Sequence, residues 1–291
     1  MRIVTVAFNP GTELLKLIAS IESLQFDLPS NTFDTESPRN DWELVIVNNG
    51  GTTPALEEAA LQKNVRIVEA GENLGYGRAV NLGAADYSGK WLLVVNPDVQ
   101  LQPDTVQKLL AAAAENPQAG VYGPRIYTPG GDIYPSARNF PRLLSGIGHG
   151  VLAPIWPGNP FTKKYQNLLT TAENTPVDWL SGACLLIRMA AFRECGGFDN
   201  RYFMFFEDTQ LGEDMKAHGW QSLYVPSAVV CHEQGKSWKE RPLPMIAAHH
   251  ESAYLYLKGV YNKPRQAPLR WLLRCGLQIR KKILTRFHSA G

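Results

Sequence analysis

The chain has 291 residues, of which 44% are hydrophobic and 19% are charged, and its formal net charge is +2. This composition excludes a disordered or collagen-like chain and is typical of one large globular domain or two small ones. No apolar run reaches about 18 residues, so we expect no transmembrane helix, and the N-terminal segment MRIVTVAFNPG lacks the features of a signal peptide. The four cysteines are widely spaced without a CxxC pair, which disfavours a disulfide framework or zinc knuckle and favours the reducing cytosol.

The near-neutral net charge conceals a separation of charge along the chain. Residues 264–291 contain seven Lys or Arg and no Asp or Glu, whereas the other 263 residues contain 22 basic and 27 acidic residues. A tail of charge +7 on a body of charge −5 suggests an anionic partner, either a membrane or a nucleic acid.

The first half of the chain alternates between strand and helix patterns. We expect strands at residues 3–8, 44–47, 65–68 and 91–95, and helices from residue 12 and at 54–62, 78–87 and 105–115. The polar residues 27–41 indicate a surface loop. Regular alternation predicts a mostly parallel sheet with helices on both faces, in which ligands bind beyond the carboxyl ends of the strands.

The second half begins with an irregular segment. Residues 129–176 are rich in Pro, Gly and aromatic residues, and a loop-rich stretch of this length inside a compact domain is usually functional. Regular patterns then return as strands at 183–187, 222–225 and 228–231 and as helices at 209–218 and 243–261.

Polar residues follow the second and fourth predicted strands, as Asn48-Asn49 and Asn96-Pro97-Asp98. Between these strands, residues 72–78 read ENLGYGR before a helix, where glycines permit close backbone approach and a helix N-terminus favours a pyrophosphate. Each motif alone is also typical of an ordinary βα turn. Three of them at one sheet edge favour a nucleotide site.

Asp98 is the strongest candidate metal ligand, because it should emerge at the sheet edge and hard cations prefer carboxylate oxygen. The alternative is that Asp98 caps the helix at 105–115, but Asp104 lies nearer to that helix start and fits the cap better.

Glu207-Asp208 follows the aromatic segment YFMFF and opens a helix. Two acids there either complement the helix dipole or form a catalytic base whose pKa is raised by apolar neighbours. His232 ends a strand-like run without another Cys or His at ligand spacing. His249 and His250 fall in a predicted helix, and we interpret them as structural or surface residues.

Seven motifs carry a resemblance to the family 2 inverting glycosyltransferases of the GT-A fold. They are VTVAFNPG, VIVNNGG, ENLGYGRAVN, VVNPDV, VDWLSGACLLIR, FFED and HEQGKS, in the family's order over residues 3 to about 280. Within that family, YPSARNFP, PIWPGNPFTKKY and APLRWLLR resemble the actinobacterial enzymes that transfer L-rhamnose in cell-wall linker synthesis. The resemblance implies an α/β GT-A fold, with a Rossmann-like, mostly parallel central sheet, helices on both faces and added C-terminal helices.

The resemblance also implies a role for each matching residue. The implied donor-binding residues are Phe8, Asn9, Asn48, Asn49, Asn73, Gly75, Tyr76, Gly77, Arg78, Asn81 and Asn96. Trp179, Ser181 and Gly182 match the acceptor-side loop, and Asp208 matches the catalytic base, with Glu207 beside it as the second candidate. Asp98 and His232 would hold a divalent cation, Mn²⁺ or Mg²⁺. Two positions depart from the family pattern, because Asn48 and Asn96 each replace an aspartate, which lowers the negative charge at the base-binding and metal sites.

The substrates implied by the resemblance are dTDP-rhamnose as donor and N-acetylglucosaminyl-diphospho-decaprenol as a polyprenyl-diphosphate-linked acceptor. Residues 1–238 would form the catalytic domain, with a donor half at about 1–128 and an acceptor half at about 129–238. Residues 239–291 would add helices, of which 264–291 form a basic amphipathic tail. On a helical wheel Leu272, Ile279 and Ile283 share one face, with Arg274 and Lys281 opposite, which is typical of membrane-surface binding. The enzyme would then be cytoplasmic and peripheral on the inner face of the plasma membrane, without a nucleic-acid partner.

Three alternatives remain at the level of the sequence. The sugar could differ, for example galactofuranose from a UDP donor, or the tail could pack on the body or form a dimer interface. A non-catalytic nucleotide-sugar or lipid-binding module would be favoured if Asp98 and Asp208 were far apart. A dinucleotide oxidoreductase is excluded because no GxGxxG turn follows the first strand.

Overall fold

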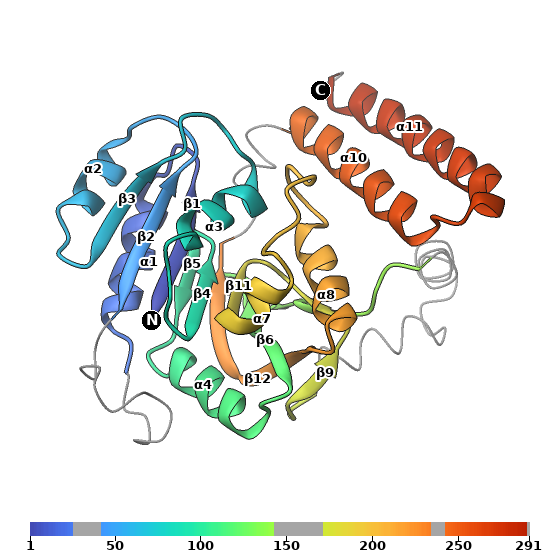
Figure 1. Ribbon diagram of the computed structural model, residues 1–291. Coiled ribbons are helices and arrows are strands. Elements are labelled where there is room, and N and C mark those ends of the chain that lie inside the picture. The colour runs from blue at the N-terminus through green and yellow to red at the C-terminus, as the bar shows by residue number, and fades with distance from the viewer. Residues whose placement is uncertain (26–41, 143–170, 234–241, 290–291) are drawn as a thin grey trace.

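The computed structural model describes residues 1–25, 42–142, 171–233 and 242–289. The loop expected at 27–41, the greater part of the irregular segment 129–176 and the proposed boundary at 238/239 lie outside these residues. The described chain forms an α/β body and a C-terminal helical hairpin (Figure 1).

The centre of the body is a mixed sheet. Its main path runs through β3 (Val65–Glu69), β2 (Glu43–Asn48), β1 (Arg2–Ala7), β4 (Trp91–Val95), β11 (Cys184–Arg188), β6 (Ala119–Tyr127), β12 (Gln221–His232) and β5 (Val99–Leu101). Two short strands, β7 (Ile133–Tyr134) and β9 (Thr175–Val177), pair with β6 and β12, and a separate pair joins β8 (Ala137–Arg138) to β10 (Trp179–Leu180).

Both faces of the sheet are buried under helices, because the strands are apolar at almost every position. Successive residues point to opposite faces, so Ile3 joins one core cluster and Val4 the other. The first cluster packs under α1 (Thr12–Glu22), α2 (Pro54–Ala60) and α4 (Thr105–Glu115). The second packs under α3 (Tyr76–Ala84), α7 (Met189–Glu194) and α8 (Glu207–Ala217). The mostly parallel sheet with helices on both faces is confirmed.

Strand direction explains why the candidate residues gather at one edge. β1 is parallel to β2 and β4, so the segments after these strands emerge together. β11 runs antiparallel between β4 and β6, and therefore begins at the same edge, preceded by residues 181–183. β12 is parallel to β6 and ends there with His232.

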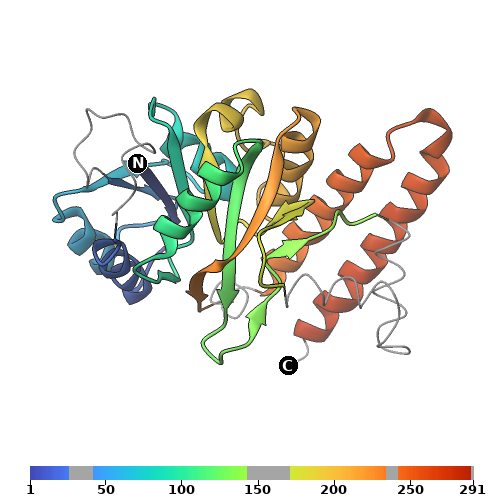
Figure 2. The ribbon, with the colours of Figure 1, turned by 90° about the horizontal axis from the view of Figure 1, so that it is seen from below.

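The C-terminal hairpin consists of α10 (Pro242–Val260), a 3₁₀ turn at Pro264–Gln266 and α11 (Ala267–Ser289). The two helices lie side by side, and seen from below they stand against one end of the body (Figure 2). Ser252 on α10 donates a 2.8 Å hydrogen bond to the Met204 carbonyl, and the Tyr256 hydroxyl donates one of 2.6 Å to Glu213 on α8. No helix in the described part of the chain is long and apolar enough to cross a membrane.

The predicted cap of α4 is wrong in one respect. Asp104 occupies the position before the helix, but its side chain makes no capping hydrogen bond and instead forms a 2.6 Å ion pair with Lys108. Thr105 donates its hydroxyl proton to the Val229 carbonyl, which ties the start of the helix to β12.

Candidate active site

The two acids predicted as catalytic candidates open α8 and face different surroundings. Asp208 accepts hydrogen bonds from the Gly182 N–H at 3.1 Å and from the Thr209 N–H at 2.7 Å. Glu207 is 6% exposed, and its Oε2 has no hydrogen-bond partner among the described residues.

These surroundings separate the protonation states of the pair. Burial and the neighbouring Asp208 charge raise the pKa of Glu207 well above its usual range. Burial also raises the pKa of Asp208, but donors from Gly182 and Thr209 and the positive charge of Arg138 act in the opposite direction. A carboxylate with N–H donors is stabilised in its charged form, whereas a buried carboxyl without partners is stabilised in its neutral form. Asp208 is therefore the member of the pair suited to accept a proton.

The segment that carries these acids is held in an unusual backbone conformation. Phe205 and Phe206, directly before Glu207, have φ values of 67° and 65°, in the left-handed region that non-glycine residues rarely adopt. Their rings contact the ring of His249 on α10 at centroid distances of 5.5 and 5.6 Å. Burial and the neighbouring His250 lower the pKa of His249 to about 4, so His249 packs here as a neutral ring. This agrees with its interpretation as a structural residue.

Tyr76 connects the start of α3 to Asp208 through Gly182. Its hydroxyl donates a 2.6 Å hydrogen bond to the Gly182 carbonyl, and the N–H of the same glycine binds Asp208. Burial, Glu207, Asp208 and, more weakly, Asp98 raise the pKa of Tyr76 well above 10. The phenol therefore stays protonated as a donor, and it lies within electrostatic reach of both predicted catalytic and metal carboxylates.

Gly75 allows α3 to approach the catalytic segment. Its φ is 80°, and an added Cβ would lie 1.9 Å from the Phe203 carbonyl oxygen. The Tyr76 N–H donates a 2.9 Å hydrogen bond to that same oxygen. Only glycine satisfies both the left-handed φ and the close contact. The bond also occupies one of the N–H groups at the helix N-terminus that we expected to face a pyrophosphate.

The amides after β2 form a hydrogen-bond network at the edge of the sheet where we expect the nucleotide. Asn48 donates to Glu69 at the end of β3 and accepts from the Gly50 N–H. Asn49 donates to the Gly75 carbonyl and to Asn73, which in turn accepts from the Gly75 N–H. The amide of Asn49 therefore holds the segment from Asn73 to Gly75 in place before α3.

Other predicted donor residues lie farther out on the same edge. Phe8 is 40% exposed, and Asn9, with a φ of 50°, accepts a hydrogen bond from the Gly51 N–H. Gly77 is buried at the first turn of α3, where an added Cβ would contact Phe198, while Arg78 is exposed. The donor-binding roles of these residues stay predictions.

Asn81 lies one turn further along α3, and its amide is engaged within the protein. It donates to the Phe198 carbonyl at 2.7 Å and accepts from the Phe198 N–H at 2.8 Å. These bonds hold Phe198, which precedes the segment with Glu207 and Asp208. The predicted place of Asn81 near ribose and pyrophosphate gains no support from these contacts.

The predicted metal residues come together through the pairing of β5 with β12. His232 pairs with Val99, which places Asp98 beside the histidine, and His232 Nε2 lies 3.0 Å from Asp98 Oδ1. Asn96 Nδ2 lies 3.4 Å from the same nitrogen, and the buried Nδ1 has no partner among the described residues. Within those residues no three His, Cys, Asp or Glu side chains form a metal cluster. Asp98 and His232 thus offer two ligands, with the amide of Asn96 adjacent.

The acceptor-side loop is fixed by the small β8–β10 sheet. Trp179 donates its indole N–H to the Asn139 carbonyl, and Ser181 donates its backbone N–H to the Ser136 carbonyl. Gly182 follows and donates its backbone N–H to Asp208. The three predicted acceptor residues therefore lie in one chain segment, which contacts Asp208 through Gly182.

Sequence reasoning missed two residues near this segment, Tyr134 and Arg138. The Arg138 guanidinium lies over the ring of Trp179 at 5.1 Å and near the ring of Tyr134 at 5.5 Å. Tyr134 contacts the ring of His232 edge-on at 6.4 Å. Both residues belong to the irregular segment 129–176, in strands of only two residues, which are too short to show periodicity. The motif YPSARNFP was the only signal for them.

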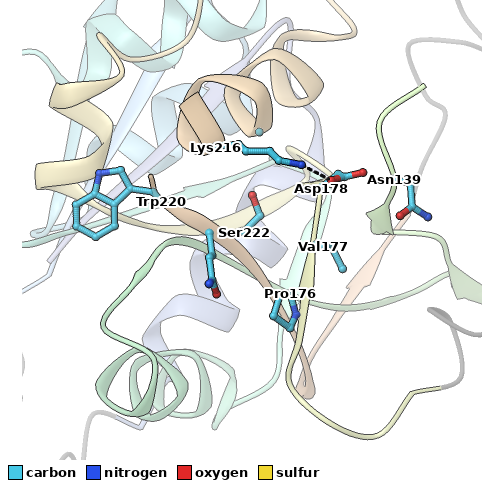
Figure 3. Close-up of a pocket in the computed structure, with 9 residues that line it drawn as sticks. Asn139, Pro176, Val177, Asp178, Lys216, Trp220 and Ser222 are labelled. Atoms are coloured by element: carbon cyan, nitrogen blue, oxygen red, sulfur yellow. Dashed lines mark hydrogen bonds and ion pairs between the residues drawn. The ribbon is translucent and has the colours of Figure 1, made fainter. Parts of the chain in front are cut away.

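A surface pocket of about 280 Å³ lies between β9, α8 and the start of β12 (Figure 3). Asp178 and Lys216 form a 3.3 Å ion pair at its rim. None of the candidate site residues lines it, so we do not assign the pocket to the reaction.

The sequence comparison decides the family. Residues 2–196 match the family described as glycosyl transferase family 2. The chain is a family 2 glycosyltransferase. It is 40% identical, over 98% of its own length and 92% of the relative's, to N-acetylglucosaminyl-diphospho-decaprenol L-rhamnosyltransferase of Mycobacterium tuberculosis (strain CDC 1551 / Oshkosh).

Solved structures support the fold of this glycosyltransferase. A mannosyltransferase from Pyrobaculum calidifontis, in complex with GDP-Man and Mn²⁺, is similar with a TM-score of 0.58 and 13% identity, over 96% of this chain and 70% of that one. TarS 1–349 of S. aureus, in complex with UDP-GlcNAc, gives a TM-score of 0.57 and 14% identity, over 95% and 71% of the two chains. The predicted GT-A glycosyltransferase fold is confirmed.

Proposed function

We propose that this glycosyltransferase transfers L-rhamnose, with inversion, from dTDP-L-rhamnose to N-acetylglucosaminyl-diphospho-decaprenol, which makes the rhamnosyl-GlcNAc linker of the arabinogalactan cell wall. The observation that carries the proposal is the 40% identity over nearly the whole chain to a mycobacterial enzyme with that name. The arrangement of Asp208 and Asp98 at one sheet edge agrees with it.

Asp208 acts as the base in this proposal. Its carboxylate removes the proton from an acceptor hydroxyl while the hydroxyl oxygen attacks the anomeric carbon from the face opposite the nucleotide. Gly182 and Thr209 hold the carboxylate by hydrogen bonds, and Tyr76 fixes Gly182 through its carbonyl. Glu207, whose pKa is raised by burial, stays neutral and adds no second charge beside the base.

The residues at the metal position fit a divalent cation such as Mn²⁺ or Mg²⁺. A carboxylate oxygen and an imidazole nitrogen lie within 3.0 Å of each other, with one imidazole nitrogen buried and unpartnered among the described residues. Such ions commonly take one or two protein ligands and complete their shell with water and substrate phosphates. When bound, the cation would offset the negative charge that develops on the departing nucleotide diphosphate.

The lipid acceptor would be reached from the membrane surface through α11. The charged face of this helix is turned toward α10, because Lys281 pairs with Glu251 at 2.9 Å and Arg274 lies over the ring of Tyr254. The opposite, outer face exposes Trp271, Leu272, Ile279 and Ile283, which are 64%, 59%, 59% and 49% exposed.

Cations border that outer face, since Arg280, Lys282 and Arg286 are exposed. An apolar helix face with cations along its border is suited to an anionic lipid surface. The apolar side chains enter the headgroup region and the cations contact the lipid phosphates. This arrangement favours peripheral attachment at the cytoplasmic face over packing of the apolar helix face on the body.

A donor screen tests the proposal. The chain is incubated with a GlcNAc-diphospho-lipid acceptor and either dTDP-rhamnose or UDP-sugars, with and without Mn²⁺ or Mg²⁺. Transfer from dTDP-rhamnose is expected. Transfer from a UDP-hexose alone would establish the alternative, a different family 2 hexosyltransferase, and binding without transfer from any donor would favour a non-catalytic module.

A further inference from the structure

Arg138 is a cation at the candidate site that neither the seven family motifs nor the proposed reaction uses. β8 pairs with β10 in a register that sets Arg138 directly opposite Trp179. Opposite residues of an antiparallel pair point to the same face. The guanidinium therefore lies over the ring of Trp179, at 5.1 Å from its centroid.

Several contacts fix the orientation of this guanidinium. Its Nε donates to the Pro135 carbonyl at 2.7 Å, and one terminal nitrogen donates to the Tyr134 hydroxyl at 3.2 Å. The ring of Tyr134 lies 5.5 Å away on another side. Among the described residues the other terminal nitrogen, Nη1, has no hydrogen-bond partner. An arginine held in this way presents a fixed pair of N–H donors at low entropic cost.

The neighbours of Arg138 lie between the predicted metal residues and the predicted base. Tyr134, which it touches, contacts the ring of His232 on the metal side. Trp179, on its other side, lies three residues before Gly182, which contacts Asp208. The positive charge of Arg138 acts on Asp208 as well. No carboxylate forms an ion pair with Arg138 in the described part of the chain.

We propose that Arg138 binds a phosphate oxygen of a substrate diphosphate through its free N–H groups. This inference rests on the proposed function, in which both substrates carry a diphosphate. Arginine suits phosphate because its planar fork matches two oxygens at once. The diphosphate belongs either to the nucleotide of the donor or to the lipid of the acceptor, and binding measurements separate the two.

The test compares Arg138→Met and Arg138→Lys with the wild-type chain. Titration with dTDP and with inorganic pyrophosphate measures the donor side without reference to the sugar. If the donor diphosphate is the ligand, Arg138→Met weakens dTDP binding by about 10- to 100-fold, as expected for a lost hydrogen bond to a charged group. Arg138→Lys, which keeps the charge and loses the fork, gives an intermediate loss.

The acceptor arm uses two acceptors, a GlcNAc-diphospho-lipid and an alkyl GlcNAc without phosphate. If the acceptor diphosphate is the ligand, Arg138→Met raises KM by a similar factor for the first acceptor only, and dTDP binding is unchanged. Lys216→Met serves as the control. Lys216 also lies over an aromatic ring, that of Phe140, but it pairs with Asp178 and lines the surface pocket of Figure 3 instead.

Unchanged binding of dTDP, pyrophosphate and both acceptors in Arg138→Met would overturn the proposal. An equal loss for phosphorylated and phosphate-free acceptors, together with a lower Tm, would also overturn it by indicating a structural role. If the wild-type chain binds dTDP and transfers a different sugar, the proposed function fails while the Arg138 comparison stands.

Discussion

The backbone N–H of Gly182 donates a 3.1 Å hydrogen bond to Oδ2 of Asp208, and this bond joins the loop before β11 to the start of α8 across 26 residues of sequence. It holds a charged carboxylate beside Glu207, a carboxyl group that has no donor for its Oε2 among the described residues. Two adjacent acids of similar chemistry therefore differ in what each can do.

Replacement of each acid by its amide should affect the two positions differently. Asp208→Asn removes the base and should lower kcat by about 10²- to 10⁴-fold, while dTDP-rhamnose still binds. Glu207→Gln replaces a neutral carboxyl by a neutral amide of the same shape and should retain most activity. Steady-state kinetics with donor-binding titrations measure both. Near wild-type transfer by Asp208→Asn, or loss confined to Glu207→Gln, would move the base to Glu207.

The pH dependence of kcat should report the ionisation of Asp208. Because burial raises the pKa of this carboxyl, its protonated form persists to higher pH than for an exposed aspartate, whose pKa is 3.8. Activity should be full above the raised pKa and should fall as the pH drops through it, with one proton bound. A pH–rate profile in the presence of saturating substrates measures this. An acid limb at or below 3.8 would contradict the assignment.

Gly75→Ala should disturb the catalytic segment. The new methyl group meets the Phe203 carbonyl, and the left-handed φ adds strain, so we expect a loss of about 2 kcal/mol or more in unfolding free energy together with reduced kcat. Gly71→Ala is a matched control, because Gly71 has a φ of 77° with nothing within 4 Å of an added Cβ. Chemical denaturation and kinetics compare the two variants. Equal effects would show that only the φ matters.

Asp98→Asn should weaken cation-dependent nucleotide binding. Loss of the anionic ligand beside His232 should lower the affinity for dTDP in the presence of Mn²⁺ by more than about tenfold, whereas binding without metal should change little. Titration calorimetry with and without Mn²⁺ measures the difference. Asp104→Asn, at the start of α4, is the control. A loss that is equal with and without Mn²⁺ would argue against metal ligation.

The outer face of α11 should bind anionic vesicles. Replacement of Leu272, Ile279 and Ile283 by Ser should abolish pelleting with phosphatidylglycerol liposomes. A shortened chain that ends at Pro264 should also fail to pellet with them. Leu61→Ser, at an 85% exposed leucine on the body, should not affect it. Raised salt should weaken binding, because exposed charges are screened. Equal pelleting of the full-length and shortened chains would remove the membrane role from α11.

The alternation of strands and helices in the first half could be predicted because each element is long enough to show its period. β4 and α4, for example, have the predicted bounds. Shared strand direction then placed Asn48 and Asp98 at one edge, as expected from their positions after β2 and β4.

Other parts of the site depend on contacts between distant segments. The pairing that sets Asp98 beside His232 joins residues 134 positions apart, and only the family resemblance suggested it. Arg138 lies in a strand of only two residues, which is too short to show periodicity. Asn81 shows another limit of the sequence, since an amide at a predicted ligand position can also bind backbone, as it does at Phe198. Its predicted place near the donor stays a prediction.

The left-handed backbone at Phe205 and Phe206 links the stability of the two parts of the molecule. Each such residue costs about 1–3 kcal/mol. The rings of Phe205 and Phe206 contact His249 on α10, and the carbonyl of the preceding Met204 accepts a hydrogen bond from Ser252. We infer that without α10 these residues would relax, and Asp208 would lose its position while the sheet remained folded. Hydrogen exchange at residues 204–208 would detect that local opening, and unchanged protection after His249→Ala with Ser252→Ala would refute it. The hairpin would then be a thermodynamic component of the catalytic centre, rather than a separable anchor.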